Sequence, residues 1–180
     1  MFKHSNKGLT YLELVVSITV AVLLTAFFTI TITTAHRNNA NRAKDKIEVS
    51  VKTARNNAIS RGSDNGWANF YYKDNKVYCY IGKEIDFDTN PASLTSPDQR
   101  WELIASNVTT FTVDTVDLVD GNCAGVDFKQ STGELRCWKF PNASGAAYHS
   151  PADGYKLKIA VIVGDKSDSS LFIDKFGTCK

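Results

Sequence analysis

The chain has 180 residues, and its 21 lysines and arginines nearly balance 19 aspartates and glutamates, which gives a formal net charge of +2. This balance excludes an overall bias toward polyanions such as nucleic acids. The length is sufficient for one domain with its own hydrophobic core in addition to a membrane segment.

The first 35 residues combine a short basic leader with a long apolar run. The leader ends in Gly8, and residues 14–35 form an uncharged, mostly apolar run of 22 residues. About 20 such residues in helical form cross the hydrocarbon core of a bilayer, so this run is long enough to span it. Glu13 stands at the start of the run, where a carboxylate is costly unless it finds a partner. The positively charged or titratable leader residues are Lys3, His4 and Lys7.

Two general interpretations of this segment compete. A secretory signal peptide also begins with a basic region, and Thr33 and Ala35 are small residues suited to cleavage. Its apolar core is normally about 7–15 residues long, however, and both the longer run and Glu13 argue against it. A plain single-span membrane anchor fits the composition and stays open as an alternative.

A third interpretation rests on a resemblance. Lys7-Gly8 followed by Leu9-Thr10-Tyr11-Leu12-Glu13-Leu14 resembles the class III signal of type IV prepilins. The resemblance implies cleavage between Gly8 and Leu9, N-methylation of Leu9, and a role for Glu13 in filament assembly. Leu9 departs from the more usual Phe, and Tyr11 replaces the usual small hydroxyl residue.

The resemblance also implies partners and a location. The partners are other pilin or pseudopilin subunits, a prepilin peptidase and an inner-membrane assembly platform. The expected location is the bacterial inner membrane, with the N-terminus in the cytoplasm, and then a pilus or pseudopilus in the periplasm or at the cell surface.

The helical pattern continues beyond the apolar run. Small and branched apolar residues recur at intervals of three and four, as on one face of an α-helix, and charged residues fill the other faces. Gly62 after Arg61 is typical of a helix C-terminus. We expect one helix over residues 9–61, with its Ala-rich stripe against a sheet. The stripe residues are Ala40, Ala43, Ile47, Val51, Ala54 and Ala58.

After Gly66 the hydrophobic period changes to two, which predicts strands. A helix followed by antiparallel strands is an α+β arrangement. The expected parts are therefore a leader (1–8), a membrane or filament-core half of the helix (9–35), an amphipathic half (36–61) and a β-rich domain (62–180). Hairpins are predicted for 67–72 with 77–81, for 126–128 with 135–138, and for 155–163 with 171–176; residues 102–119 give one or two strands, and 82–100 and 141–154 are long loops.

Two further segments resemble a particular pilin group. Residues 51–62 are similar to the end of the first helix in GspH/FimT-like minor pilins and pseudopilins, and residues 126–133 to a later strand and turn. This resemblance favours a minor component over a major subunit. Some FimT-like pilins bind DNA, but here the C-terminal lysines alternate with acidic residues, so DNA binding is the less favoured alternative. These lysines are Lys156, Lys158, Lys166, Lys175 and Lys180.

All four cysteines follow the apolar run. Their even number fits disulfides in an oxidising compartment, and without a C-x-x-C pair a metal site is not expected. Four cysteines permit three pairings. If Phe128 opposes Glu134, then Gly125 faces Cys137, and Cys123 comes close enough to bridge Cys137 where the strand end bends at Gly121 or Gly125, so Cys123–Cys137 is favoured. That pairing leaves Cys79 for Cys179.

No pattern in the chain predicts an enzyme, a cofactor or a metal centre. Residues 86–90 open like a calcium loop, but Pro91 replaces the required glycine. Residues 164–168 are expected to form a hairpin turn. No Ser–His–Asp or Cys–His spacing suggests a nucleophile, and the isolated histidines are His4, His36 and His149. The aromatic residues between 67 and 80 are expected to form core and cross-strand pairs.

Overall fold

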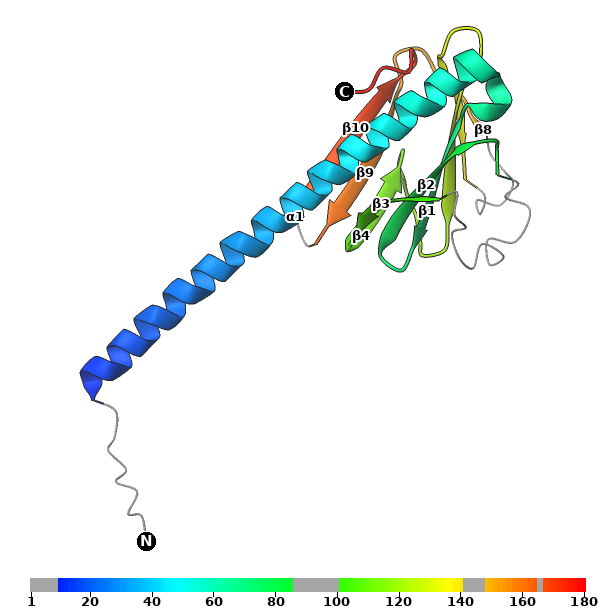
Figure 1. The fold of residues 1–180 in the computed structure, drawn as a ribbon. Helices are drawn as coiled ribbons and strands as arrows, with labels where there is room; N and C mark the ends of the chain where they lie inside the picture. The colour runs from blue at the N-terminus through cyan, green and yellow to red at the C-terminus, as the bar shows by residue number, and fades with distance from the viewer. Residues whose placement is uncertain (1–9, 86–100, 141–147, 165–166) are drawn as a thin grey trace. The chain divides into compact units, whose positions relative to one another are not determined.

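The computed structural model describes residues 10–85, 101–140, 148–164 and 167–180. It has the predicted α+β class, with one long N-terminal helix packed against two antiparallel sheets (Figure 1). The chain divides into two units, one ending at Ala35 and the other beginning at His36. Helix α1 (Tyr11–Arg61) contributes residues to both units.

Local signals fix both ends of α1. Thr10 caps the N-terminus, because its Oγ1 accepts a hydrogen bond from the backbone N–H of Glu13 (3.3 Å). At the other end Gly62 adopts φ +98° and its N–H donates to the carbonyl of Ala58. A short 3₁₀ turn, η1 (Ser63–Asn65), follows. The predicted helix end at Arg61 is confirmed.

The second half of α1 rests on the sheets through its small residues. All six residues of the predicted stripe are buried, together with Ser50. Asn41 accepts a hydrogen bond from Ser169 of β10, and Lys46 donates to the carbonyl of Leu103 in β3 (2.8 Å). Because β3 and β10 belong to different sheets, the helix contacts both.

The first sheet has six strands in the order β3-β2-β1-β6-β7-β8. Asp74 and Asn75 adopt positive φ in the tight β1–β2 turn, the backbone form that matches strand twist in two-residue hairpins. The strands are β1 (Trp67–Lys73), β2 (Lys76–Gly82), β3 (Glu102–Ser106), β6 (Cys123–Phe128), β7 (Leu135–Lys139) and β8 (Tyr148–His149). The three predicted strand pairings are confirmed, but β10 begins at Ser167, four residues before the predicted start of its strand. Strand β8 lies in a segment expected to be only a loop.

The second sheet has four strands in the order β10-β9-β4-β5. Its strands are β4 (Val108–Val113), β5 (Val116–Asp117), β9 (Lys156–Val163) and β10 (Ser167–Asp174). Residues 102–119, where one or two strands are predicted, form β3 and β4, which Asn107 separates with φ +57°, and a short third strand, β5, which follows Asp114 at φ +61°. The two strands on either side of Asn107 therefore enter different sheets.

Aromatic side chains join the two sheets in the core. The rings of Phe70 in β1 and Phe111 in β4 lie 5.8 Å apart, and both side chains are fully buried. Trp138 of β7 stacks on Tyr155 with ring centroids 5.1 Å apart. Aromatic residues suit this position because a polar side chain buried between two packed sheets would need a hydrogen-bond partner.

The register of the β6–β7 hairpin differs from the prediction. Gly125 faces Lys139, and Cys137 faces Asp127 rather than Gly125. A register shift between Asp127 and Phe128 accompanies this change. Phe128 faces Leu135, one residue from its expected partner, and beyond the shift residues 125–127 pair two residues away from the expected register.

Candidate functional site: the N-terminal helix and its support

Residues 11–35 of α1 present apolar side chains to their surroundings. This helix is long and apolar enough to cross a membrane by length and composition. Its large apolar side chains are exposed around the helix, among them Leu23, Phe27 and Ile30, each more than half exposed. A continuous apolar surface of this kind requires lipid or other protein around it.

The hydroxyl groups of this segment are satisfied within the helix itself. Each serine and threonine between residues 11 and 35 donates a hydrogen bond of 2.8–2.9 Å to the carbonyl oxygen four residues earlier. An unsatisfied hydroxyl would be costly in hydrocarbon, so these bonds make the segment compatible with lipid. The residues are Ser17, Thr19, Thr25, Thr29, Thr31, Thr33 and Thr34.

Glu13 lies in the first turn of α1, where a carboxylate is favoured by the helix dipole. Thr10 and Glu13 have the spacing of a capping box, a signal that the sequence reasoning missed. Among the described residues the Glu13 carboxylate has no cationic partner. Gly8 and Leu9, the expected cleavage and methylation positions, lie outside the described residues.

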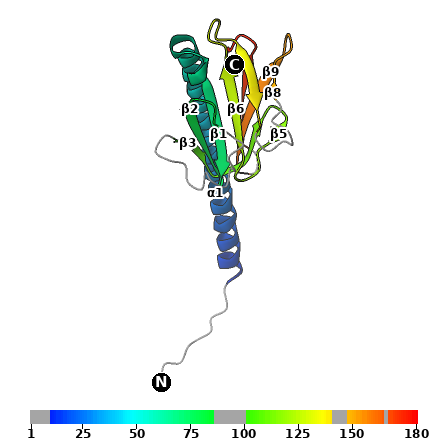
Figure 2. The ribbon, with the colours of Figure 1, turned by 90° about the vertical axis from the view of Figure 1, so that its right-hand side faces the viewer.

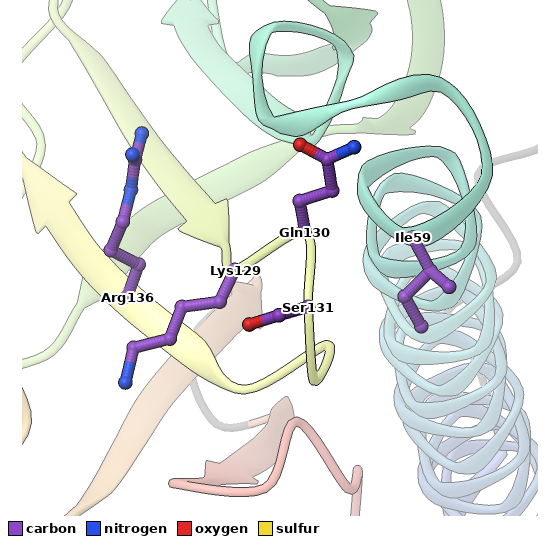
Figure 3. A pocket seen from close by; sticks show the side chains of 5 residues that line it. All are labelled: Ile59, Lys129, Gln130, Ser131 and Arg136. Carbon is purple, nitrogen blue, oxygen red and sulfur yellow. The ribbon is translucent and has the colours of Figure 1, made fainter.

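The two segments that resemble GspH/FimT-like proteins contact each other. Arg55 Nε donates a 3.0 Å hydrogen bond to the carbonyl of Gly133 in the β6–β7 turn. Nearby, a shallow depression of about 700 Å³ lies between α1 and this turn (Figure 3). Its lining residues are Ile59, Lys129, Gln130, Ser131 and Arg136.

The two cations of this depression are already paired. Lys129 Nζ lies 3.0 Å from Glu134, and Arg136 pairs with Asp127. The depression therefore offers little free positive charge for an anionic ligand.

Asp127 of β6 is a buried carboxylate in the first sheet. Its side chain is fully buried, and burial raises the pKa of Asp127 to about 6, although the Arg136 guanidinium opposes that shift. One carboxylate oxygen, Oδ1, has no hydrogen-bond partner. The sequence pattern around Asp127 did not predict that its carboxylate is buried. Its ion pair with Arg136 depends on the observed β6–β7 register, which the sequence does not reveal.

The four cysteines are free thiols, and neither expected disulfide is present. Cys123 lies opposite Tyr71, whereas Cys137 lies opposite Asp127, four residues further along β6. Four residues of strand span about 13 Å, too far for the expected Cys123–Cys137 bridge.

The expected Cys79–Cys179 bridge fails for a different reason. Cys79 lies in β2 of the six-stranded sheet, whereas Cys179 pairs with Ile173 of β10, an edge strand of the four-stranded sheet. The two thiols therefore belong to different sheets and are not brought together. The argument for an oxidising compartment, which used the even cysteine count, therefore loses its support.

The remaining sequence candidates do not converge on a site. The described residues contain no group of three or more His, Cys, Asp or Glu side chains suited to a metal ion. His149 stacks on Trp138, and Lys175 pairs with Asp153. The expected aromatic pairing is confirmed for Tyr71 and Tyr78, whose rings lie 6.4 Å apart. His4, Lys166 and residues 86–90 lie outside the described residues.

The architecture, a long N-terminal apolar helix whose second half packs on antiparallel sheets, is pilin-like. Comparisons of the chain with models of protein families, with curated proteins and with solved structures find no match.

Proposed function

We propose that this chain is a structural subunit, a minor pilin or pseudopilin, of a type IV pilus or a type II secretion pseudopilus. The observation that carries the proposal is the N-terminal segment of α1, which is apolar on its outside and has all its serine and threonine hydroxyls bonded to its own backbone. Such a helix is stable in lipid and equally stable among the apolar helices of neighbouring subunits.

The chemistry of assembly follows from the two ends of this segment. Cleavage between Gly8 and Leu9 frees an α-amino group, which is then methylated, four residues from Glu13. In the filament, the Glu13 carboxylate of one subunit neutralises the amino terminus of a neighbour. Both charges otherwise stay unpaired in an apolar interior, so the pair favours the assembled state.

The sheet domain has a supporting role in this proposal. The buried stripe of α1 and the Arg55–Gly133 hydrogen bond hold the sheets on the second half of the helix. No catalytic role is proposed for the chain. The partners are other subunits, the peptidase that removes the leader and the assembly platform in the inner membrane.

Intact-mass measurement of the protein extracted from membranes tests the proposal. We expect loss of residues 1–8 and one added methyl group at Leu9. An intact N-terminus would instead indicate a plain single-span anchor, and a new N-terminus after Ala35 would indicate a secretory signal peptide.

A further inference from the structure

The face of the first sheet that points away from the Phe70–Phe111 core carries two buried polar side chains in one row. Asn69 of β1 is fully buried, and Lys139 of β7 is 7% exposed. Asn69 is paired with Gly125 of β6, and Gly125 is paired with Lys139, so both side chains project from the same face. Figure 2 shows β1 and β6 side by side. A lysine is rarely buried so deeply without a specific reason.

Gly125 leaves the space between these two side chains open. Asn69 and Lys139 are two strand spacings apart, which is roughly 10 Å between Cα atoms. A Cβ atom at Gly125 would be 3.3 Å from Asn69 Oδ1, so the amide of Asn69 leans across β6 toward β7. An extended lysine side chain from β7 is long enough to meet this amide above the glycine.

Glu84 holds the amine of Lys139 near the same amide. Lys139 Nζ lies 3.1 Å from Glu84 Oε1, and the Glu84 side chain is 36% exposed. Asn69 Nδ2 donates a hydrogen bond of 3.1 Å to the carbonyl oxygen of Lys83, the residue before Glu84. Because two consecutive residues bind the amide and the amine, this short segment brings the two groups together.

The Asn69 amide is only partly satisfied by hydrogen bonds. Its Nδ2 donates to backbone carbonyl oxygens, whereas Oδ1 has no hydrogen-bond partner among the described residues. An asparagine that served hydrogen bonding alone would be expected to use both ends of its amide when buried. The carbonyl group of Asn69 therefore remains available for a reaction with a neighbouring nucleophile.

We propose that Lys139 and Asn69 form an intramolecular amide bond in the folded protein. Glu84 accepts a proton from the Lys139 ammonium, and the resulting amine attacks Cγ of Asn69. A bond forms between Nζ and Cγ, and the bond between Cγ and Nδ2 breaks. Glu84 passes two protons in turn from Nζ to Nδ2, so Nδ2 leaves as an ammonium ion and the Glu84 carboxylate is regenerated.

The fold supplies what this reaction lacks in free solution. A carboxylate within hydrogen-bond distance of the amine can act as the base, and the fixed positions of amine and amide replace a bimolecular encounter. Conversion of the ammonium into a neutral amide also removes the cost of a buried charge. A depression of about 260 Å³ beside Glu84 gives the leaving ammonium ion a route to solvent.

The bond joins β1 to β7 across β6 and goes beyond the proposed function. Like a disulfide, a covalent link between distant residues restricts the unfolded chain and so stabilises the folded state. Unlike a disulfide, it does not depend on the redox compartment, which matters in a domain whose four cysteines are free thiols.

Peptide mapping of the full-length protein, purified in detergent and then denatured, tests the proposal. Trypsin should release residues 62–73 joined to residues 137–156, because the amide at Lys139 prevents cleavage after that residue. The joined peptide should weigh less than the sum of its two parts by one ammonia molecule. Separate peptides, with cleavage after Lys139, would overturn the proposal.

Three substitutions identify the reacting groups. Glu84→Gln keeps the shape of the side chain but removes the base, so it should lower the fraction of joined peptide about tenfold or more. Lys139→Arg keeps a cation beside Glu84 but cannot form the bond, so the joined peptide should disappear. Lys83→Arg changes an exposed neighbouring lysine and is the matched control, which should leave the joined peptide unchanged. Persistence of the joined peptide in Lys139→Arg would overturn the proposal.

Asn69→Asp gives a readout that a purely structural role would not produce. An aspartate forms the same amide with loss of water, so the joined peptide of this variant should have the same mass as that of the wild type. If the wild type instead joined residues 101–129 to residues 137–156 with loss of water, Asp127 would be the reacting group and the assignment to Asn69 would be wrong.

This proposal and the proposed function fail independently. A joined peptide in a protein that keeps residues 1–8 would support the amide bond and contradict the filament role. Loss of residues 1–8 without a joined peptide would overturn the amide bond alone.

Discussion

Arg55 of α1 and Gly133 of the β6–β7 turn are joined by a 3.0 Å hydrogen bond across 78 residues of sequence. The same guanidinium lies against the C-terminal turn, because a Cβ atom at Gly177 would be 3.0 Å from Arg55 Nε. Arg55 thus contacts two turns that belong to different sheets. Gly133 and Gly177 have no side chain to collide with the Arg55 side chain, and both adopt positive φ.

Gly177→Ala should destabilise the protein by roughly 2–4 kcal/mol. The new Cβ would lie 2.6 Å from the carbonyl oxygen of Gly133, a backbone atom that cannot move aside easily, and φ is +72°. Gly154→Ala is the matched control, since φ is +80° with nothing within 4 Å, and it should cost only about 1 kcal/mol. Chemical denaturation of both variants measures the difference. Equal losses would show that packing at Gly177 is unimportant.

Asp127→Asn should remove a pH dependence of stability. Because burial raises the pKa of Asp127 from 3.8 to about 6, the folded state binds a proton between these pH values that the unfolded state releases. Wild-type stability should therefore fall as pH rises from about 4 to 6, by up to roughly 3 kcal/mol from this group alone.

The measurement for Asp127 is the free energy of unfolding of wild type and Asp127→Asn at several pH values. Their difference isolates this group, because the other carboxylates Glu134 and Asp153, whose pKa values are lowered by Lys129 and Lys175, contribute equally to both proteins. A constant difference between pH 4 and 7 would contradict the assignment.

All four cysteines should react as free thiols once the protein is unfolded without a reductant. Burial raises the pKa values of Cys79 and Cys123 to about 12, so in the folded protein both should react slowly with a maleimide. Mass spectrometry counts the adducts. A disulfide between Cys123 and Cys137 would contradict the observed β6–β7 register.

Gly8→Leu should block removal of the leader. The proposed scissile bond follows Gly8, and a bulky side chain there would prevent its fit to a peptidase that accepts glycine. Immunoblots of a C-terminally tagged protein should show only the longer precursor. Normal processing of Gly8→Leu would contradict the prepilin interpretation while leaving the fold untouched.

Glu13→Val should preserve or improve membrane insertion and impair filament assembly. Removing the carboxylate lowers the cost of placing the helix start in lipid, and a neighbouring amino terminus then lacks its partner. Thr10 still caps the helix, so α1 should form normally. Shearing and immunoblotting measure incorporation, and wild-type incorporation of Glu13→Val would count against the charge pair.

Local patterns were sufficient to predict most of the secondary structure. The three- and four-residue spacing from Ala40 to Ala58 predicted the buried face of α1, and Gly62 predicted its end. Both features are set by residues close together in the sequence, so they can be read without knowledge of the tertiary structure. The β1–β2 hairpin was predicted by Asp74 and Asn75, residues that tolerate positive φ. The apolar run likewise determines by itself that residues 11–35 can span a membrane.

The strand register, the assignment of strands to sheets and the contacts of the helix with the turns depended on the tertiary structure. The sequence of the β6–β7 hairpin is compatible with more than one register, and only packing in the sheet places Cys137 beside Asp127 and away from Cys123. The split of residues 102–119 between two sheets, and the meeting of Arg55 with Gly133, depend on contacts between segments far apart in sequence. Such contacts form only when the whole core closes, so no local spacing of residues could reveal them.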